Sequence, residues 1–469
     1  MKSHSMRLAA LAGVVLLSAV GCSSSAGSNS SASGNPTASN STTSGNPAAG
    51  AGDATSIKVV YLLEGANSPL DVVMKQAKAE YEKANAGVTV DLQPIKSSAD
   101  DYFTKLALMN RTASTAPDVM YEDSFKVKSD AAAGFLAPLD DRLKSWADWS
   151  QYVDAAKGAG QGVDGSTYSV SLGTDTQGIW YNKEVFAKAG IAEPFAPKSW
   201  DDLLAAARKI KASVPGVYPW EIYSGIQLAE AGSVRGFQTL LSGTQDSLFD
   251  EKTHKWVVNS KGFEDTLNMI HTVYSEKLAP EASVALDPAL TQTVEGTWLP
   301  KAKVGMVIDG SWLPSGWKET FPDWSKKLGW AAIPTQAGTG AGATSMSGGW
   351  TVAMGSKTKQ ADKAFGFITT LLSQQNSLKY AIEGNQIAVR NDIAAEASYT
   401  GANPSVPFFT KQVAVTHFRP ATPDYPQISQ QIAIATDAVV NGTSPADAAK
   451  AYDKAVIGIV GQSNTESGR

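Results

Sequence analysis

A strand, a helix and a second strand follow one another in "SIKVVYLLEG", "SPLDVVMKQAKAEYEKANAG" and "VTVDLQPI", and this order constrains the fold most. The first segment is a short apolar run, and the third alternates in the manner of a strand. Between them, one helical face collects Leu70, Val73, Met74, Ala77 and Tyr81. A strand–helix–strand unit implies a parallel sheet with helices on its faces, so the sequence predicts the α/β class.

The same pattern continues along the chain. "PDVMYEDS" and "KVGMVIDGSW" predict further strands, and "PKSWDDLLAAARKIKASVPG" predicts a helix between Ser199 and Pro215. The glycine-rich "GTGAGATSMSGG" predicts a surface loop that leads into a strand at Trp350. The strands and helices span about 410 residues, which is more than one core usually organises, so we expect two lobes.

The N-terminus has the features of a secretory signal. Lys2 and Arg7 precede an apolar run of 13 residues, Leu8–Val20, which is too short for a permanent membrane span. Small residues then lead to Cys22, the only cysteine of the chain. The segment resembles a bacterial lipoprotein signal, which implies cleavage after residue 21 and a diacylglyceryl group on Cys22. The alternative is an ordinary signal peptide with an incidental cysteine.

Residues 22–56 predict a lipidated cysteine followed by a flexible linker. From Ser23 to Ser56 the chain is almost wholly small and polar, with Asp53 as its only charge. Such a segment buries too little apolar surface to fold, and its ends lie roughly 30 Å apart on average. We therefore expect the protein on the extracellular face of the cell membrane, or in the periplasm if the cell has an outer membrane.

Composition excludes several classes of function. Loss of Lys2 and Arg7 with the signal changes the formal charge from −5 to −7, and no run of basic residues remains. This argues against nucleic acid or an anionic lipid surface as the main partner. The mature chain contains only three histidines, which are far apart in the sequence. Because zinc sites need several His or Cys ligands, we do not interpret the protein as a zinc enzyme. We predict no cofactor, no metal and a monomer, with the membrane reached only through the lipid anchor.

Four segments in a fixed order carry a resemblance to a known family. They are "IWYNKEVFAKAGIAEPFAPKSWDDLLAAARKI", "KAKVGMVIDGSW", "MSGGWTVAM" and "RPATPDYPQISQQIAIATDAVVNGTSPADAAKAY". Together they resemble bacterial extracellular solute-binding proteins of the carbohydrate type, the receptors of ATP-binding-cassette (ABC) sugar importers. Maltose- and trehalose-binding proteins are among them. The resemblance covers nearly everything from Ile57 to Val460.

This resemblance implies two α/β lobes joined by a three-segment hinge, with ligand held in the cleft between them. The expected crossings lie near 173–174, 333–334 and 386–389. The N-lobe would then comprise 57–173 and 334–386, and the C-lobe 174–333 and 387–462. A disordered tail, 463–469, would follow.

The resemblance also implies which residues bind a sugar, whose hydroxyls need polar partners and whose C–H faces need aromatic rings. The strand-end acids are Glu64, Glu122, Asp123 and Asp175, and the aromatic plates are Trp312 and Trp350. Gly348 and Gly349 would allow close approach of the backbone, and Arg419 would hold hydroxyls or a carboxylate. Trp220, Glu221 and Tyr223 match less closely. Structural alternatives are helix caps or loop charges for the acids, core packing for the tryptophans and an interlobe salt bridge for Arg419.

The predicted function is capture of a di- or oligosaccharide and its delivery to the permease subunits of an ABC importer, without catalysis. The same fold could instead bind a polyamine or glycerol phosphate. A secreted glycoside hydrolase would also combine tryptophans and carboxylates, but no acid/base pair is evident in the sequence. Motifs of serine hydrolases, zinc proteases and phosphate loops are missing from the sequence as well.

Overall fold

The structure is a computed structural model that describes residues 55–63 and 68–468. The predictions for the signal, Cys22, most of the linker and Glu64 therefore lie outside the described residues. Within those described ranges, no helix combines the length and apolar character that crossing a membrane requires.

The first sheet has five strands in the order β2-β1-β3-β13-β4. They are β1 (Thr55–Leu63), β2 (Val88–Lys96), β3 (Val119–Asp123), β4 (Ser169–Ser171) and β13 (Trp350–Met354). β1 pairs in parallel with both β2 and β3, as the strand–helix–strand pattern predicted. β13 returns from far along the chain and pairs antiparallel with β3 and β4.

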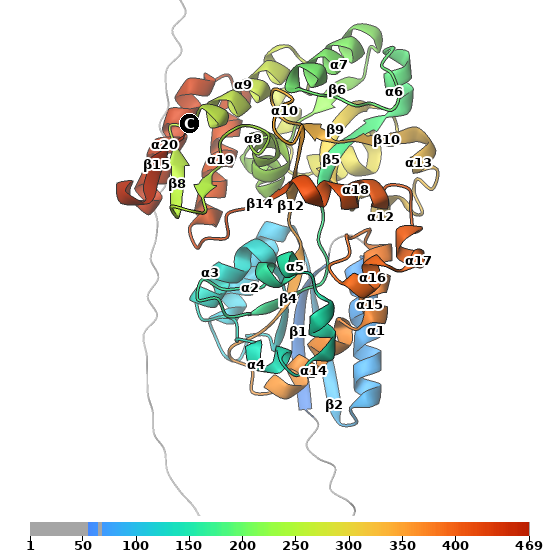
Figure 1. Cartoon of the computed structure of the whole chain (residues 1–469), viewed down its shortest axis with the longest axis vertical. Coiled ribbons are helices and arrows are strands. Elements are labelled where there is room, and N and C mark those ends of the chain that lie inside the picture. Colours follow the sequence, from blue (N-terminus) through green and yellow to red (C-terminus); the bar gives the residue numbers. More distant parts are fainter. Residues whose placement is uncertain (1–54, 64–67, 469) are drawn as a thin grey trace, which may run out of the picture. The chain divides into compact units, whose positions relative to one another are not determined.

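Helices cover this sheet and, with it, form what we call the first lobe. They are α1 (Pro69–Ala84), α2 (Ala99–Asn110), α3 (Ser124–Ala132), α4 (Asp140–Leu143), η1 (Ala147–Gln151), α5 (Asp154–Ala159), α14 (Ala361–Leu371), α15 (Gln374–Glu383), α16 (Asn391–Ala394) and α17 (Ala397–Thr400). Figure 1 shows α1 beside α15 and near β2, with which it makes contact. The buried residues of α1 are the five predicted from helical spacing.

The second sheet has four strands in the order β10-β5-β9-β6. They are β5 (Gln177–Asn182), β6 (Tyr218–Glu221), β9 (Val304–Gly310) and β10 (Leu328–Ala331). Every residue of β9 is buried because the sheet is covered on both faces. Ile179, Trp220 and Met306 pack on one face, while Trp180 and Val307 pack on the other.

The second lobe consists of this sheet and its covering helices. They are α6 (Lys183–Lys188), α7 (Trp200–Ser213), η2 (Ile226–Leu228), η3 (Ala231–Gln238), α8 (Thr239–Leu241), α9 (Lys261–Ser275), α10 (Ala282–Ala285), α11 (Leu290–Thr293), η4 (Val294–Trp298), α12 (Leu313–Trp317), α13 (Trp324–Lys327), α18 (Val406–Gln412), η5 (Val413–Val415), α19 (Tyr425–Val440), α20 (Pro445–Val460) and η6 (Gln462–Asn464). η3 and η4 are π-helical.

Two small sheets complete the fold. One contains β11 (Ile333–Pro334), β12 (Ala343–Ser347) and β14 (Thr416–Phe418), and the other contains β7 (Phe249–Asp250), β8 (Lys255–Val258) and β15 (Thr465–Ser467). The prediction of a disordered tail is wrong for residues 463–468, because β15 pairs in parallel with β8. Thr465 is buried there, and its hydroxyl donates to the Gln462 carbonyl at 2.9 Å. β12 is a strand within the segment predicted to be a loop.

The chain passes between the lobes in several segments. The first passage lies between β4 and β5, where Thr174 and Ile387 exchange backbone hydrogen bonds of 3.1 and 2.7 Å. β12 contacts β5 and α8, so second-lobe packing continues to Ser347. α16 and α17 pack on α15, so first-lobe packing continues to Thr400. These contacts differ from the boundaries at 334 and 387 that the sequence predicted.

Candidate ligand-binding site

Asp123 is the last residue of β3, the central strand of the first sheet. Its Oδ1 accepts a hydrogen bond from the Phe125 amide at 3.3 Å, which caps α3. The same oxygen lies 2.6 Å from Nη2 of Arg419. Burial raises the pKa of Asp123, and the charge of Arg419 opposes that rise. The side chain thus combines the helix-cap role that the sequence left open with an ion pair.

Arg419 joins the two lobes. Besides its contact with Asp123, its Nη1 donates to Oε2 of Glu230 at 3.0 Å, and its guanidinium lies 4.3 Å from the ring centroid of Phe125. Asp123 and Phe125 belong to the first lobe, whereas Glu230 precedes η3 in the second. Only 11% of the Arg419 side chain is exposed. The interlobe salt bridge that the sequence offered as an alternative is therefore present.

Asp175 lies in the first passage between the lobes. The amide of Gly348 donates to Asp175 Oδ1 at 3.3 Å, and the Ser347 hydroxyl donates to the Asp175 carbonyl at 2.6 Å. Burial raises the pKa of the Asp175 carboxyl to about 6, against the opposing charge of Arg419. The neighbouring Asp123 adds to the rise. The Asp175 carboxylate therefore lies close enough to Arg419 and Asp123 for their charges to affect its pKa.

The glycine pair before β13 allows this close approach. A Cβ on Gly348 would lie 2.9 Å from Nη2 of Arg419 and 3.5 Å from the Asp175 carboxylate. Gly349 has a φ of +129°, and a Cβ there would lie 2.6 Å from the carbonyl oxygen of Gly173. The pair therefore leaves room for Arg419 and for the neighbouring passage between the lobes.

Trp350 begins β13 directly opposite Asp123. Its ring stacks on Tyr121 with centroids 4.5 Å apart and an angle of 2°, and on Phe103 at 5.6 Å and 24°. The side chain is half-buried. Trp350 is thus part of an aromatic group of the first lobe beside Asp123, and its contact with a ligand stays a prediction.

A second arginine organises the facing region of the second lobe. Arg235 Nη1 lies 2.8 Å from Glu295 Oε1 and 3.0 Å from Asp309 Oδ1. Its guanidinium also lies 5.0 Å from the ring centroid of Tyr223 and 5.5 Å from that of Trp312. The Tyr223 hydroxyl donates to Asp309 Oδ2 at 3.0 Å. Trp312 and Tyr223 thus share one charged partner.

Two glycines bring these groups together. A Cβ on Gly236 would lie 1.6 Å from the Tyr223 carbonyl oxygen, so only glycine lets η3 pack directly on that backbone and place Arg235 there. A Cβ on Gly310 would lie 1.9 Å from the Trp312 ring, which folds back over the end of β9.

Three other predicted site residues are buried within the lobes. Glu122 alternates with Asp123 along β3, so it faces the opposite side of the sheet; it is fully buried, and burial raises its pKa well above the ordinary value. Neither of its carboxylate oxygens has a hydrogen-bond partner among the described residues. Trp220 packs in the second-lobe core. Glu221 is fully buried, and burial raises its pKa to about 8.

The structure therefore brings together two arginines and five carboxylates, which we call the acid–arginine cluster. Its members are Asp123, Asp175, Glu230, Arg235, Glu295, Asp309 and Arg419. Asp175 connects the two halves because its pKa responds to both arginines. Four of these residues were missed from sequence: Glu230, Arg235, Glu295 and Asp309. Asp309 is the second-last residue of the predicted strand "KVGMVIDG", so the strand-end argument could have included it, whereas the other three lie in π-helical or irregular segments without a motif.

This arrangement is suited to binding polar ligands. Carboxylates accept hydrogen bonds, guanidinium groups donate them in pairs, and indole rings cover apolar faces. Within 55–63 and 68–468, the structure places no group of three or more His, Cys, Asp or Glu side chains where they could hold a metal ion.

The known proteins that this chain resembles in sequence or structure include several solute-binding proteins. The chain is 25% identical over 421 residues to the diacetylchitobiose binding protein DasA of Streptomyces coelicolor, covering 86% of this chain and 89% of DasA. An ABC transporter solute-binding protein from Thermotoga lettingae, solved with α-D-tagatose, superposes with a TM-score of 0.73 at 22% identity, covering 86% of this chain and 99% of that one. The GacH receptor of Streptomyces glaucescens, solved unliganded and with acarbose, also gives 0.73, at 23% identity, with 87% and 99% covered.

These structures confirm the predicted two-lobed α/β fold. The family model described as "Bacterial extracellular solute-binding protein" matches residues 66–377, about two thirds of the chain. The matched range contains three of the four segments from which the resemblance was predicted, whereas the fourth, which begins at Arg419, lies beyond it. The protein therefore belongs to the family of bacterial extracellular solute-binding proteins.

Proposed function

We propose that this protein captures a carbohydrate, of di- or oligosaccharide size, between its two lobes and delivers it to the permease subunits of an ABC importer. The observation that carries the proposal is the acid–arginine cluster, in which Arg419 connects Asp123 of one lobe to Glu230 of the other. Trp312 and Trp350 stand beside it. The ligands named for the relatives, tagatose, acarbose and diacetylchitobiose, support a carbohydrate ligand, and the last two also support the larger size.

The chemistry of the cluster supports a sugar because its polar groups are satisfied mainly by one another. Sugar hydroxyls can both donate to Asp123 or Glu230 and accept from Arg419, so they can replace these bonds without leaving a buried charge unpaired. Binding would then require the lobes to part and close again, which is a common motion of two-lobed binding proteins.

Isothermal titration and thermal unfolding with a panel of mono-, di- and trisaccharides test the proposal. A sugar at 100 times its Kd stabilises the folded protein by about 2.7 kcal/mol. The Trp312→Ala/Trp350→Ala double variant should lose that binding while keeping its circular dichroism spectrum. Trp149→Ala is the control: Trp149 contacts Tyr152 and Lys157, neither of which belongs to the acid–arginine cluster, so this variant should leave binding unchanged.

The charges of the cluster favour one second candidate, a polyamine. Four carboxylates pair with the two arginines, and Asp175 lies within reach of the charges of both, which gives an excess of acidic groups that ammonium groups could neutralise. Titration with spermidine and with glycerol phosphate therefore belongs in the same panel. Micromolar or tighter spermidine binding, with no response to any sugar, would replace the carbohydrate assignment.

Membrane attachment through Cys22 is a separate part of the proposal. The cysteine follows a short apolar signal and precedes the small, polar segment Ser23–Ser56, which suits a lipid anchor on a linker. Wild-type protein should fractionate with membranes, and Cys22→Ala should appear in the soluble or culture fraction with its sugar affinity unchanged. Soluble wild-type protein with a free Cys22 thiol would favour the ordinary signal peptide instead.

A further inference from the structure

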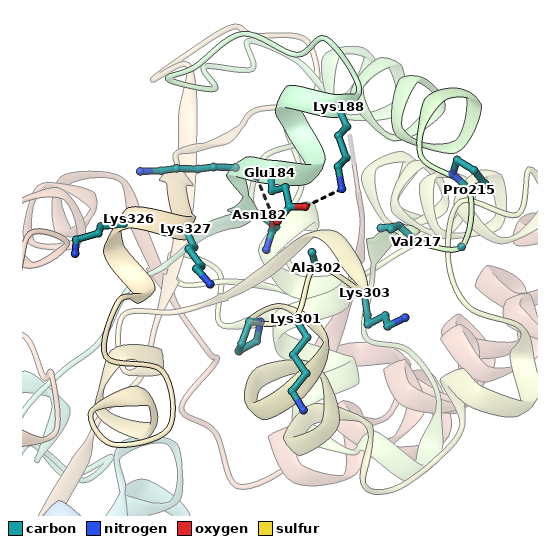
Figure 2. A pocket seen from close by; sticks show the side chains of 13 residues that line it. Asn182, Glu184, Lys188, Pro215, Val217, Lys301, Ala302, Lys303, Lys326 and Lys327 are labelled. Carbon is teal, nitrogen blue, oxygen red and sulfur yellow. Dashed lines mark hydrogen bonds and ion pairs between the residues drawn. The ribbon is translucent and has the colours of Figure 1, made fainter.

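Six lysines surround one hollow on the second lobe, with a volume of about 590 Å³. The six are Lys183, Lys188, Lys301, Lys303, Lys326 and Lys327, and Glu184 is the only acidic residue of its lining. Figure 2 labels five of them, Lys188, Lys301, Lys303, Lys326 and Lys327, on the segments around the turn that carries Ala302. We call this hollow the lysine pocket. None of the predicted sugar-binding residues lines it.

The lysine pocket lies at the opposite end of the second sheet from the acid–arginine cluster. Lys303 directly precedes β9, whereas Asp309 is near the end of that strand. A strand of seven residues spans roughly 20 Å. Val217 precedes β6, and Lys327 precedes β10, so the same end of the sheet supplies both. The two sites are therefore separate.

Three of the six ammonium groups already have partners. Lys188 Nζ lies 2.7 Å from Glu184, Lys326 Nζ lies 2.9 Å from Asp323, and Lys183 Nζ donates to the Ser325 carbonyl at 3.1 Å. Lys301, Lys303 and Lys327 form no ion pair with a carboxylate in the part of the chain that the structure describes, and Lys327 Nζ lies 5.7 Å from the ring centroid of Phe321. The lining therefore carries more positive charge than its single glutamate can balance.

Hydrogen bonds fix the turns that carry these lysines. The Asn182 side chain accepts from the amides of Glu184 and Val185 at 3.1 and 3.2 Å and donates to the Leu299 carbonyl at 3.0 Å. This joins the start of α6 to the turn before β9, where Ala302 has a φ of +56°. The charged side chains thus stand on a fixed backbone.

We propose that the lysine pocket binds a ligand carrying several phosphate groups. Ammonium groups are strongly hydrated point charges that pair with phosphate oxygens, and a polyvalent phosphate would relieve their mutual repulsion. The volume is within the range of small-molecule sites. The lysines come from three separate parts of the chain, which is why the sequence contains no basic run. The phosphates could belong to a soluble polyphosphate or to an anionic phospholipid headgroup.

The test uses the full chain, tripolyphosphate as the soluble probe, and vesicles of phosphatidylglycerol compared with phosphatidylcholine. The pocket variant is K301Q/K303Q/K327Q. Its matched control, K75Q/K144Q/K261Q, removes the same total charge from exposed lysines that pair with aspartates elsewhere. We expect the wild type and control to bind alike and the pocket variant to bind about tenfold more weakly, as expected for three exposed charge pairs.

Each outcome decides the proposal. Binding of tripolyphosphate with this variant dependence supports a soluble ligand, and binding only to phosphatidylglycerol vesicles with the same dependence supports the headgroup. No binding to either probe, or equal loss in both triple variants, overturns it. Sugar titration of the pocket variant is the independent check, because its affinity should equal that of the wild type.

Discussion

At the scale of single residues, Gly348 and Gly349 should respond differently to the same small change. A Cβ at Gly348 would lie 2.9 Å from Nη2 of Arg419, a side-chain atom rather than backbone, and this glycine has no left-handed φ. A Cβ at Gly349 meets the rigid carbonyl of Gly173, and its φ of +129° strains any other residue. We expect Gly348→Ala to shift Arg419 and weaken sugar binding about tenfold, with a smaller loss of stability than Gly349→Ala, which should cost about 2 kcal/mol of folding free energy.

Urea unfolding and sugar titration of both variants check this pair, each variant serving as the control for the other. Equal losses of stability in the two variants would contradict the contacts assigned to Arg419.

Asp175 gives a second prediction at this scale, a dependence of stability on pH. Its pKa is raised from 3.8 to about 6 in the folded protein, chiefly by burial. The folded state therefore holds this proton more tightly than the unfolded state does. The contribution of the protonated carboxyl to the free energy of unfolding is fully present below about pH 4 and is lost as pH rises through about 6. Asp175→Asn cannot ionise, so we expect it to gain about 1–2 kcal/mol over wild type between pH 4 and pH 7.5.

Denaturant unfolding of both proteins at these two pH values measures the difference. Carboxyls shared by both chains titrate in both and largely cancel in the comparison. If the two proteins differed in free energy of unfolding by the same amount at both pH values, Asp175 would ionise as an exposed aspartate does.

At the scale of elements, regular patterns were predictable from sequence and irregular ones were not. α1 buries the five residues that its spacing indicates, because packing against the first sheet and the helical period agree. The region of Glu230 and Arg235 lacks any such period. It contains the π-helical η3, and Ala229 before it has a φ of +44°. Its conformation depends on contacts such as Gly236 against Tyr223, which only the tertiary structure supplies. Similarly, β12 pairs with the preceding strand β11 and with β14, which lies far along the chain.

The turn between α15 and α16 depends on one buried arginine. Arg390 is 1% exposed, pairs with Asp392 at 2.7 Å and Asp148 at 3.0 Å, and donates to the Leu372 carbonyl at 2.6 Å. Arg390→Met would leave these partners unpaired, and we expect a loss of about 2 kcal/mol. Arg208→Met is the control: its bidentate pair with Glu276 is exposed, so that variant should lose less than about 1 kcal/mol. Equilibrium urea unfolding compares them, and equal losses would show that burial of Arg390 adds nothing.

At the scale of the whole molecule, the two lobes are connected by the chain passages and by the side chain of Arg419. Its contacts with Asp123 and Glu230 belong to different lobes, whereas the ion-pair partners of Arg235, Glu295 and Asp309, belong to one. Removal of Arg419 leaves two carboxylates of like charge facing each other across the lobes. Repulsion between them then favours separation, because hinge motion is the least costly way to restore their hydration.

We therefore expect Arg419→Met to have a larger radius of gyration than the wild type in the absence of sugar, measured by small-angle X-ray scattering. Arg235→Met also removes an arginine from the acid–arginine cluster, but it breaks no ion pair between the lobes and should scatter like the wild type. Raised salt should reduce the expansion of Arg419→Met, since screening weakens the repulsion between Asp123 and Glu230. Identical scattering of all three proteins would mean that the chain passages alone hold the lobes together, and that Arg419 serves only as a binding group.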